Sequence, residues 1–159
     1  MERNQSNEIV EAFVDAAREV SAQILGVEIE KRQEEARNSL IAFDGVVAIV
    51  GFSGALSGRL LLGIPETLSV ALFCSMGGET QPSPEEKLLT ASEFGNLVAG
   101  HALTRINNRF QGYNLRPSPP SSFLGKHIVF FNLGMMGSCV TLSTSYGEIT
   151  MDIALKEEQ

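Results

Sequence analysis

Hydrophobic residues recur at intervals of three or four near the start of the chain, over residues 4–25. An α-helix has about 3.6 residues per turn, so this spacing places the apolar side chains on one side of a helix. Gly26 follows at once, and glycine commonly ends a helix because it adopts the left-handed conformation without strain. The pattern predicts a helix whose buried side is formed by Ile9, Phe13, Ala16, Val20 and Ile24.

The pattern then changes to the alternation and short apolar runs that are typical of strands. Residues 27–32 alternate between apolar and charged side chains, which predicts an edge strand, and we expect a polar loop from there to Ser39. Residues 46–52 and 59–64 are rich in β-branched residues and leucine. Glycines lie between and beside these two segments, which predicts a hairpin. These glycines are Gly51, Gly54 and Gly58.

A second helix is expected after Pro65, because proline is well tolerated where a helix begins. It carries several apolar residues and should end at Gly77 and Gly78. The last third of the chain returns to extended patterns, with a turn expected at Tyr146 and Gly147. The predicted strands there are 127–133, 138–144 and 148–155.

The clearest helix signal in the sequence begins at Ser83. This serine is a good N-cap, Pro84 occupies the first helical position, and Glu86 completes a capping box. The helix should run to about residue 110 and end before Gly112. The chain thus reads as helix, three strands, two helices and three strands. Because helices and sheets must bury their apolar sides against each other, this order predicts an α+β sandwich, a largely antiparallel sheet with helices packed on one face.

Residues of this third predicted helix divide into a core side and a polar edge when they are placed on a helical wheel. Glu93, Asn96 and Gly100 lie together at the polar edge, one turn apart. A glycine inside a helix costs about 1 kcal/mol relative to alanine, so Gly100 calls for a reason such as the close approach of a neighbouring backbone. A solvated Glu and Asn beside a packing glycine is the alternative interpretation. The core side is formed by Ala91, Gly95, Val98, Ala99, Ala102, Leu103 and Ile106.

Composition narrows the functional classes. The 159 residues, 43% of them hydrophobic, fit one domain spanning 1–159 that can bury a core of its own. The net charge of −7 argues against general binding to nucleic acids or anionic membranes, both of which favour basic surfaces. The uncharged stretches 45–58 and 67–78 are shorter than the roughly 20 residues of a membrane span, and the first residues do not resemble a signal peptide. We therefore expect a cytoplasmic protein.

The residues that could support redox or metal chemistry are few and scattered. Cys74 and Cys139 lie in apolar surroundings and are expected to be small, reduced core residues, although the sequence cannot tell whether the fold brings them together. His101 and His127 are isolated, so metal catalysis has little support. Residues 94–131 carry four basic side chains and no acidic one, a local excess of positive charge in an acidic chain. These are Arg105, Arg109, Arg116 and Lys126.

The run from Ser92 to Gly100 resembles the ExxNxxxG signature of the CheC/CheX/FliY chemotaxis phosphatases. In that family a proline follows the asparagine after 22 intervening residues, and Asn96 and Pro119 have this separation here. The glycine-rich segment 50–58 is similar to the family's hairpin, and the resemblance spans roughly residues 5–155. It implies a CheC-like fold. The helix after Pro65 has serine rather than asparagine at the matching position, so a single site per chain is implied, as in CheX, whose members are homodimers.

The resemblance also implies a reaction and roles for residues. The substrate would be a CheY-type response regulator phosphorylated on aspartate, which itself holds Mg²⁺, so the phosphatase needs no cofactor of its own. Asn96 would orient the attacking water and Glu93 would anchor the regulator's active-site lysine, while Gly100 would allow close approach. Leu89, Leu97 and Thr104 would border the partner.

One departure from the family pattern keeps a second function open. Leu89 stands where the family has aspartate or serine, four residues before Glu93. A module that binds a response regulator without hydrolysing its phosphate, or that resembles the flagellar switch proteins, is the alternative.

Overall fold

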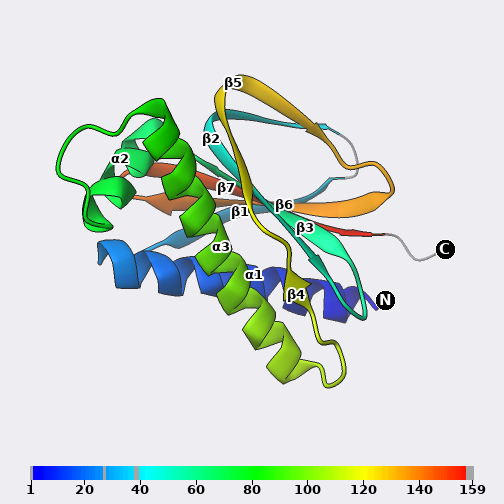
Figure 1. Cartoon of the computed structure of the whole chain (residues 1–159). Helices are drawn as coiled ribbons and strands as arrows, with labels where there is room; N and C mark the ends of the chain where they lie inside the picture. Colours follow the sequence, from blue (N-terminus) through cyan, green and yellow to red (C-terminus); the bar gives the residue numbers. More distant parts are fainter. Residues whose placement is uncertain (1, 27, 38–39, 157–159) are drawn as a thin grey trace.

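A single antiparallel sheet with helices on one face makes up the fold (Figure 1). The structure is a computed structural model that describes residues 2–26, 28–37 and 40–156. The helices of this described part are α1 (Arg3–Leu25), α2 (Glu66–Ser75) and α3 (Pro84–Arg109). Its strands are β1 (Glu30–Arg37), β2 (Leu40–Ser53), β3 (Gly58–Ile64), β4 (Arg116–Pro117), β5 (Ser121–Phe131), β6 (Met135–Thr144) and β7 (Gly147–Lys156).

The strands follow the order β1-β6-β7-β3-β2, and the far side of β2 pairs with both β4 and β5. All of these pairings are antiparallel. The hairpin predicted around the glycines is confirmed as the β2–β3 pair, in which Phe52 lies opposite Gly58. The predicted α+β sandwich is therefore confirmed.

The helix end predicted at Gly26 and the capping box predicted at Ser83 are both present in the structure. Gly26 ends α1 in a left-handed conformation, with φ of 65°. At the start of α3, the backbone N–H of Glu86 donates to the Ser83 hydroxyl at 3.2 Å, and the N–H of Ser83 donates to the Glu86 carboxylate at 3.0 Å. This reciprocal pair satisfies two backbone donors that the helix itself leaves unpaired.

The main core lies between the helices and the sheet. Phe13 of α1 packs on Phe52 of β2, with ring centroids 5.6 Å apart. The core side predicted for α3 is confirmed, since all seven of its residues are buried. Gly95 lies directly on β2, because a Cβ there would come within 2.8 Å of the Ala48 Cβ. The helix that carries the candidate site is thus held against the middle of the sheet.

The sheet is more extensive than the sequence predicted. β1 continues to Arg37, through residues expected to be a polar loop, because β6 pairs with them along a charged edge. β2 begins at Leu40 rather than at residue 46, and β5 begins at Ser121 rather than at residue 127. The expected start of the first strand at residue 27 and the end of the loop at 38–39 lie outside the described residues. The two-residue strand β4 was not predicted.

Irregularities in register explain why the periodicity missed parts of β2 and β5. The β2–β5 pairing shifts register between Phe43 and Gly45, where Gly45 has a φ of 106°. His127 of β5 also has a positive φ, of 51°. A bulge moves the following side chains to the opposite face, so strict alternation is lost although the strands continue.

Beyond this bulge, residues 40–43 of β2 and 128–131 of β5 form a two-stranded ribbon. The ribbon packs on the face of the sheet opposite the helices, and the ring of Phe43 lies so close to Gly63 that a Cβ there would collide with it. A second, smaller core cluster results. Its buried members are Ile41, Phe43, Val47, Leu61 and Cys139.

The two cysteines are both free, but only one behaves as expected. Cys139 is buried in the second core cluster, which confirms the prediction for that residue. Cys74 is exposed, so its assignment to the core was wrong. It lies in the last turn of α2, where the helix has reached the surface before the turn at Gly77.

A partly buried polar network joins the end of the ribbon to the sheet. The Arg59 guanidinium donates from Nη2 to the carbonyl of Phe131 at 2.7 Å and to the Asn132 side-chain oxygen at 2.6 Å. Asn132 donates in turn to the carboxylate of Asp152 at 3.1 Å, and Asp152 is fully buried. Burial lowers the pKa of Arg59, while the charge of Asp152 acts in the opposite direction.

We expect Arg59→Ala to lower the free energy of unfolding by about 2–3 kcal/mol, because it removes the positive charge that acts on the buried Asp152 carboxylate and leaves two acceptors without their donor. Urea denaturation followed by circular dichroism measures this change. Lys126→Ala, which removes an exposed charge from β5, is the control and should have an effect within about 0.5 kcal/mol. Equal stabilities of the two variants would contradict the role assigned to Arg59.

Candidate functional site

The predicted site residues of α3 form a stripe on its exposed side. Glu93 and Thr104 are exposed, and Asn96 and Gly100 are partly exposed. Leu89, one turn before Glu93, is 71% exposed. These five residues follow the helix over four turns, so the structure brings them together on one surface.

Two other residues near the stripe point elsewhere. Leu97, predicted to border the partner, is only partly accessible and packs against the main core. Phe94, the residue that follows Glu93, is completely buried. The exposed surface of α3 is therefore narrower than the sequence suggested.

The two glycines of α3 occupy opposite environments. Whereas Gly95 is required by the contact with Ala48, a Cβ at Gly100 would meet nothing within 4 Å. Packing within the described residues therefore does not require glycine at position 100. The Thr104 hydroxyl donates to the Gly100 carbonyl at 2.9 Å, one turn back along the helix. The open space above Gly100 is available to a partner.

The polar groups of the stripe are also available. Within the described residues, neither the Glu93 carboxylate nor the Asn96 amide makes a hydrogen bond or ion pair. Both side chains start from a helix whose backbone is fixed on the sheet, which limits where they can reach. A carboxylate and an uncharged amide are thus presented together on a convex surface.

The chain segment after α3 runs back beside the helix (Figure 1). The Asn107 side chain donates to the carbonyl of Leu115 at 3.0 Å and accepts from its N–H at 2.8 Å. At the other end of the segment, the Ser122 hydroxyl accepts from the Ser92 hydroxyl at 2.9 Å and donates to the Leu88 carbonyl at 2.8 Å. The segment between these anchors contains Pro119.

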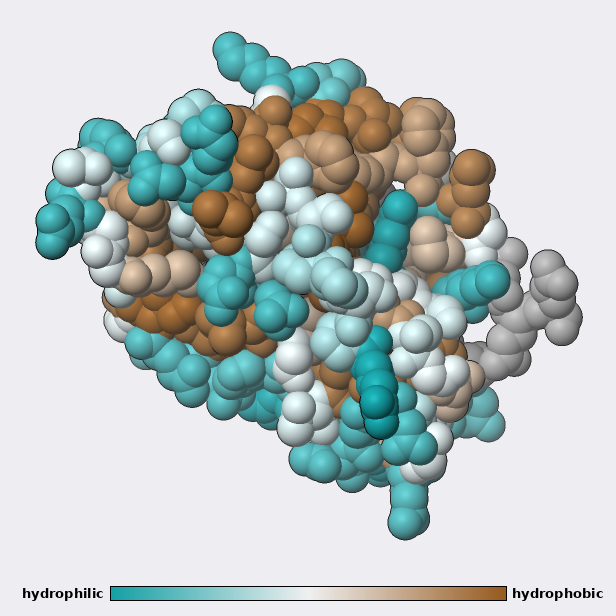
Figure 2. All heavy atoms as spheres, viewed as in Figure 1, coloured by the Kyte–Doolittle hydropathy of each residue, from teal (hydrophilic) through white to brown (hydrophobic). Residues whose placement is uncertain are grey.

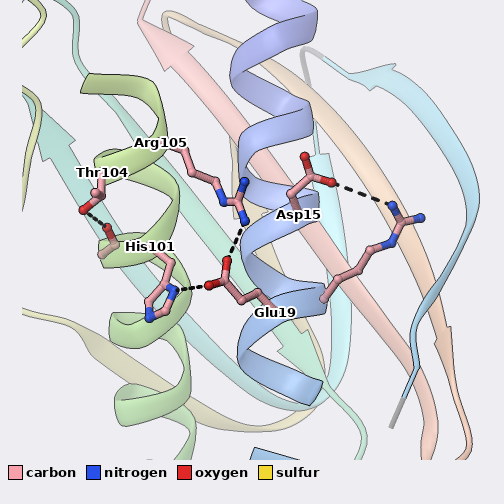
Figure 3. A network of polar contacts seen from close by, with 7 residues as sticks. Asp15, Glu19, His101, Thr104 and Arg105 are labelled. Atoms are coloured by element: carbon pink, nitrogen blue, oxygen red, sulfur yellow. Dashed lines mark hydrogen bonds and ion pairs between the residues drawn. The ribbon is translucent and has the colours of Figure 1, made fainter. Parts of the chain in front are cut away.

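On its other side, α3 is joined to α1 by ion pairs (Figure 3). Arg105 Nη2 lies 2.5 Å from a carboxylate oxygen of Glu19, and His101 Nδ1 lies 3.7 Å from the other oxygen. Arg109 Nε lies 3.2 Å from Glu8. The hydrogen bond from Arg105 lowers the pKa of Glu19, and burial opposes it. His101 thus faces α1 rather than the stripe.

These ion pairs reduce the local excess of positive charge that the sequence indicated for residues 94–131. Arg105 and Arg109 were counted in the local excess of positive charge, yet each is paired with a glutamate from α1. Charges in close ion pairs contribute little net field at a distance. The stripe itself carries a single charged residue, Glu93.

The stripe lies outside two surface grooves of the described residues. Surface grooves of about 1220 Å³ and 550 Å³ lie elsewhere, the first beside the start of α1 and the second between α1 and the end of α3, and neither is lined by Glu93 or Asn96. The described residues contain no cluster of three or more potential metal ligands. No helix among them is long and apolar enough to cross a membrane. A convex, exposed pair of polar side chains suits a macromolecular partner better than a small ligand, which favours concave sites.

The fold is that of the CheC-like chemotaxis proteins. A family model described as chemotaxis phosphatase CheX matches residues 46–141, so the chain belongs to the CheX family, as its sequence motifs predicted. No curated protein sequence matches it.

Solved structures agree with this assignment. CheX from Desulfovibrio desulfuricans superposes with a TM-score of 0.83 at 20% identity, covering 94% of this chain and 99% of the other. CheX from Vibrio vulnificus gives 0.82 at 22% identity, with coverages of 94% and 99%. A CheX–CheY–BeF3–Mg²⁺ complex from Borrelia burgdorferi gives 0.70 at 24% identity, with coverages of 93% and 97%. At these identities the likenesses establish the fold.

Proposed function

We propose that this protein dephosphorylates a CheY-type response regulator that is phosphorylated on aspartate. The observation that carries the proposal is the pair of Glu93, which is exposed, and Asn96, which is partly exposed. Neither side chain has a partner within the described residues, and the pair lies beside open space at Gly100. Membership of the CheX phosphatase family and the likeness to the CheX of a CheX–CheY complex support this reading. Such a partner would be met in the cytoplasm.

Asn96 is assigned the role of orienting the attacking water. An aspartyl phosphate is an activated acyl phosphate, and Mg²⁺ held by the regulator is part of the substrate, so this chain needs no cofactor of its own. What remains is to place a water in line with the phosphorus, and positioning dominates such transfers. An amide can accept from and donate to this water while remaining uncharged beside the phosphoryl group.

Glu93 is assigned the role of anchor. Its carboxylate would pair with the lysine of the regulator's active site, and an ion pair closed off from water by the complex is stronger than an exposed one. Gly100 would admit the regulator's backbone one turn further along. Leu89 and Thr104 would lie at the rim of the contact, whereas Leu97 contributes chiefly to packing.

A non-catalytic module that binds the regulator, or one similar to the flagellar switch proteins, is the second candidate, and Leu89 favours it. This side chain is 71% exposed where the family pattern has aspartate or serine, so it offers apolar contact area rather than a polar group beside the phosphate. One measurement distinguishes the two functions. An enzyme accelerates the decay of the phosphorylated regulator, whereas a binding module does not.

We expect Asn96→Ala to reduce the accelerated dephosphorylation by roughly tenfold to a hundredfold, because misplacing a reacting group has effects of this size. Affinity for the regulator should change little, since the lost interaction is made in the transition state. Stability should hold, because alanine favours helix more than asparagine does. Loss of phosphate from a radiolabelled regulator measures the rate.

Asn108→Ala is the matched control for this variant, because Asn108 is an exposed asparagine of the same helix outside the stripe. It should leave the rate unchanged. If Asn96→Ala hydrolyses as fast as wild type, Asn96 has no role in orienting water. If wild type itself gives no acceleration with several regulators, the binding module is the correct reading.

Glu93→Ala should weaken the complex with a beryllofluoride-activated regulator by about 5- to 150-fold, which corresponds to a charged hydrogen bond worth about 1–3 kcal/mol. Isothermal titration calorimetry measures the affinity. Glu85→Ala removes an exposed glutamate from the first turn of the same helix and should bind as wild type does. An unchanged affinity of Glu93→Ala would remove the anchoring role.

We also propose that the protein is a homodimer joined along β5. The opposite edge of the sheet, β1, has the charged sequence EKRQEEAR, which discourages pairing with another strand. β5 pairs only with β2 among the described strands, and Phe123, Val129 and Phe131 on it are 48%, 38% and 59% exposed. Figure 2 shows hydrophobic side chains gathered over this part of the molecule. A two-fold axis would place β5 of one copy beside β5 of the other, so that each copy covers the exposed apolar residues of its partner.

Sedimentation at tens of micromolar should therefore give the mass of a dimer, and Val129→Glu should shift it to the monomer by placing a charge on the pairing edge. Met136→Glu is the matched control, because Met136 is an exposed apolar residue of β6 away from β5. A monomeric wild type would contradict the proposal. Equal dissociation by both substitutions would place the interface elsewhere.

A further inference from the structure

A hydroxyl bridge connects β5 to the turn of α3 that carries Glu93. Ser92 donates its hydroxyl to the Ser122 hydroxyl at 2.9 Å, and Ser122 donates to the carbonyl of Leu88 at 2.8 Å. Each hydroxyl has one proton, so the direction of the bridge is defined. It leaves the helix at Ser92 and returns to it one turn earlier.

This bridge spans the same turn that displays two residues of the stripe. Leu88 and Ser92 are separated by four positions and lie one above the other on α3. Leu89 and Glu93 are the residues that directly follow them in the sequence, and both are exposed. A rotation or tilt of this turn would therefore move the Glu93 carboxylate.

The two halves of α3 are held by different contacts. The second half is joined to α1 by the pairs Arg105–Glu19 and Arg109–Glu8. In the first half, Lys87 lies at a looser 3.8 Å from Glu66 of α2. The bridge through Ser122 is shorter and partly buried, so it restrains this half more tightly than the longer ion pair between Lys87 and Glu66 does.

We propose that Ser122 is a positioning residue for the regulator-binding site, acting through the turn from Leu88 to Ser92 on the direction of Glu93. The inference rests on the proposed function, in which the Glu93 carboxylate pairs with the lysine of the regulator's active site. Ser122 holds the turn from the side of the sheet. Asn96 lies nearly one turn further along, where Gly95 already fixes the helix backbone against β2. Loss of the bridge should thus weaken regulator binding more than it slows the reaction in the bound complex.

The test is a pair of isosteric substitutions. Ser122→Val and Ser122→Thr have nearly the same shape, but only threonine keeps a hydroxyl. We expect Ser122→Val to bind the beryllofluoride-activated regulator about three- to tenfold more weakly than Ser122→Thr, the effect of one neutral hydrogen bond. The rate of dephosphorylation at saturating protein should differ by less than twofold. Ser121→Ala, at the exposed neighbouring position, should bind as wild type does.

A double-mutant cycle separates positioning from general loss of structure. Because Ser122 acts through Glu93, Ser122→Val should weaken binding little further when Glu93→Ala is already present. In the presence of Asn96→Ala, Ser122→Val should weaken binding as much as it does in the wild-type protein. Ser92→Ala removes the hydrogen bond from Ser92 to Ser122 but leaves the one from Ser122 to Leu88, so it should reproduce part of the weakening, even if Ser122→Val unfolds more easily.

Equal affinities of Ser122→Val and Ser122→Thr would overturn the inference, and so would full additivity with Glu93→Ala. Either result leaves the proposed function intact, provided that wild type accelerates dephosphorylation. If wild type binds the regulator without accelerating its decay, the proposed enzyme activity fails, whereas the cycle still decides whether Ser122 positions Glu93.

Discussion

The contact between Gly95 and Ala48 determines how the rest of the molecule is arranged. With no Cβ at Gly95, the backbone of α3 lies directly on β2, and a side chain there would come within 2.8 Å of the Ala48 Cβ. Close packing transmits such a constraint along a whole helix, because interiors have little free volume. It decides which side of α3 is buried, and so which residues remain on the exposed stripe.

The face of the sheet opposite the helices is covered in a different way. The bulge in β2 and β5 turns their outer halves into a ribbon that covers part of this face and completes a second core. Its attachment includes the charged network of Arg59, Asn132 and Asp152, of which Asn132 and Asp152 are buried. Such networks give less net stability than apolar packing of the same volume, but they accept few alternative geometries. The ribbon in turn displays the apolar edge of β5.

β5 therefore contributes to two surfaces of the molecule. Its outer edge is the surface that we assign to the second copy, and its inner side, through Ser122, touches the turn of α3 before Glu93. The proposed site for the regulator and the proposed dimer edge thus share one strand. The ion pairs of α1 hold the other half of α3 and offset the charge of two of the four basic residues in the local positive excess.

What the sequence determined by itself was local. The capping box at Ser83, the apolar period of α1 and the polar edge with Glu93, Asn96 and Gly100 depend on neighbours within a few residues, and each appears in the structure as predicted. The motif spacing also led to the family, which the comparison confirms. The roles of the site residues remain proposals.

What only the tertiary structure decided depends on contacts between residues distant in sequence. The charged strand β1 exists because β6 pairs with it, and the bulge near Gly45 removes the alternation by which β2 could be recognised. The exposure of Cys74, the burial of Phe94 and the bridge from Ser122 to Leu88 have no local signal. Side-chain burial and hydrogen bonds between elements are set by which surfaces meet, and periodicity within one element does not contain that information.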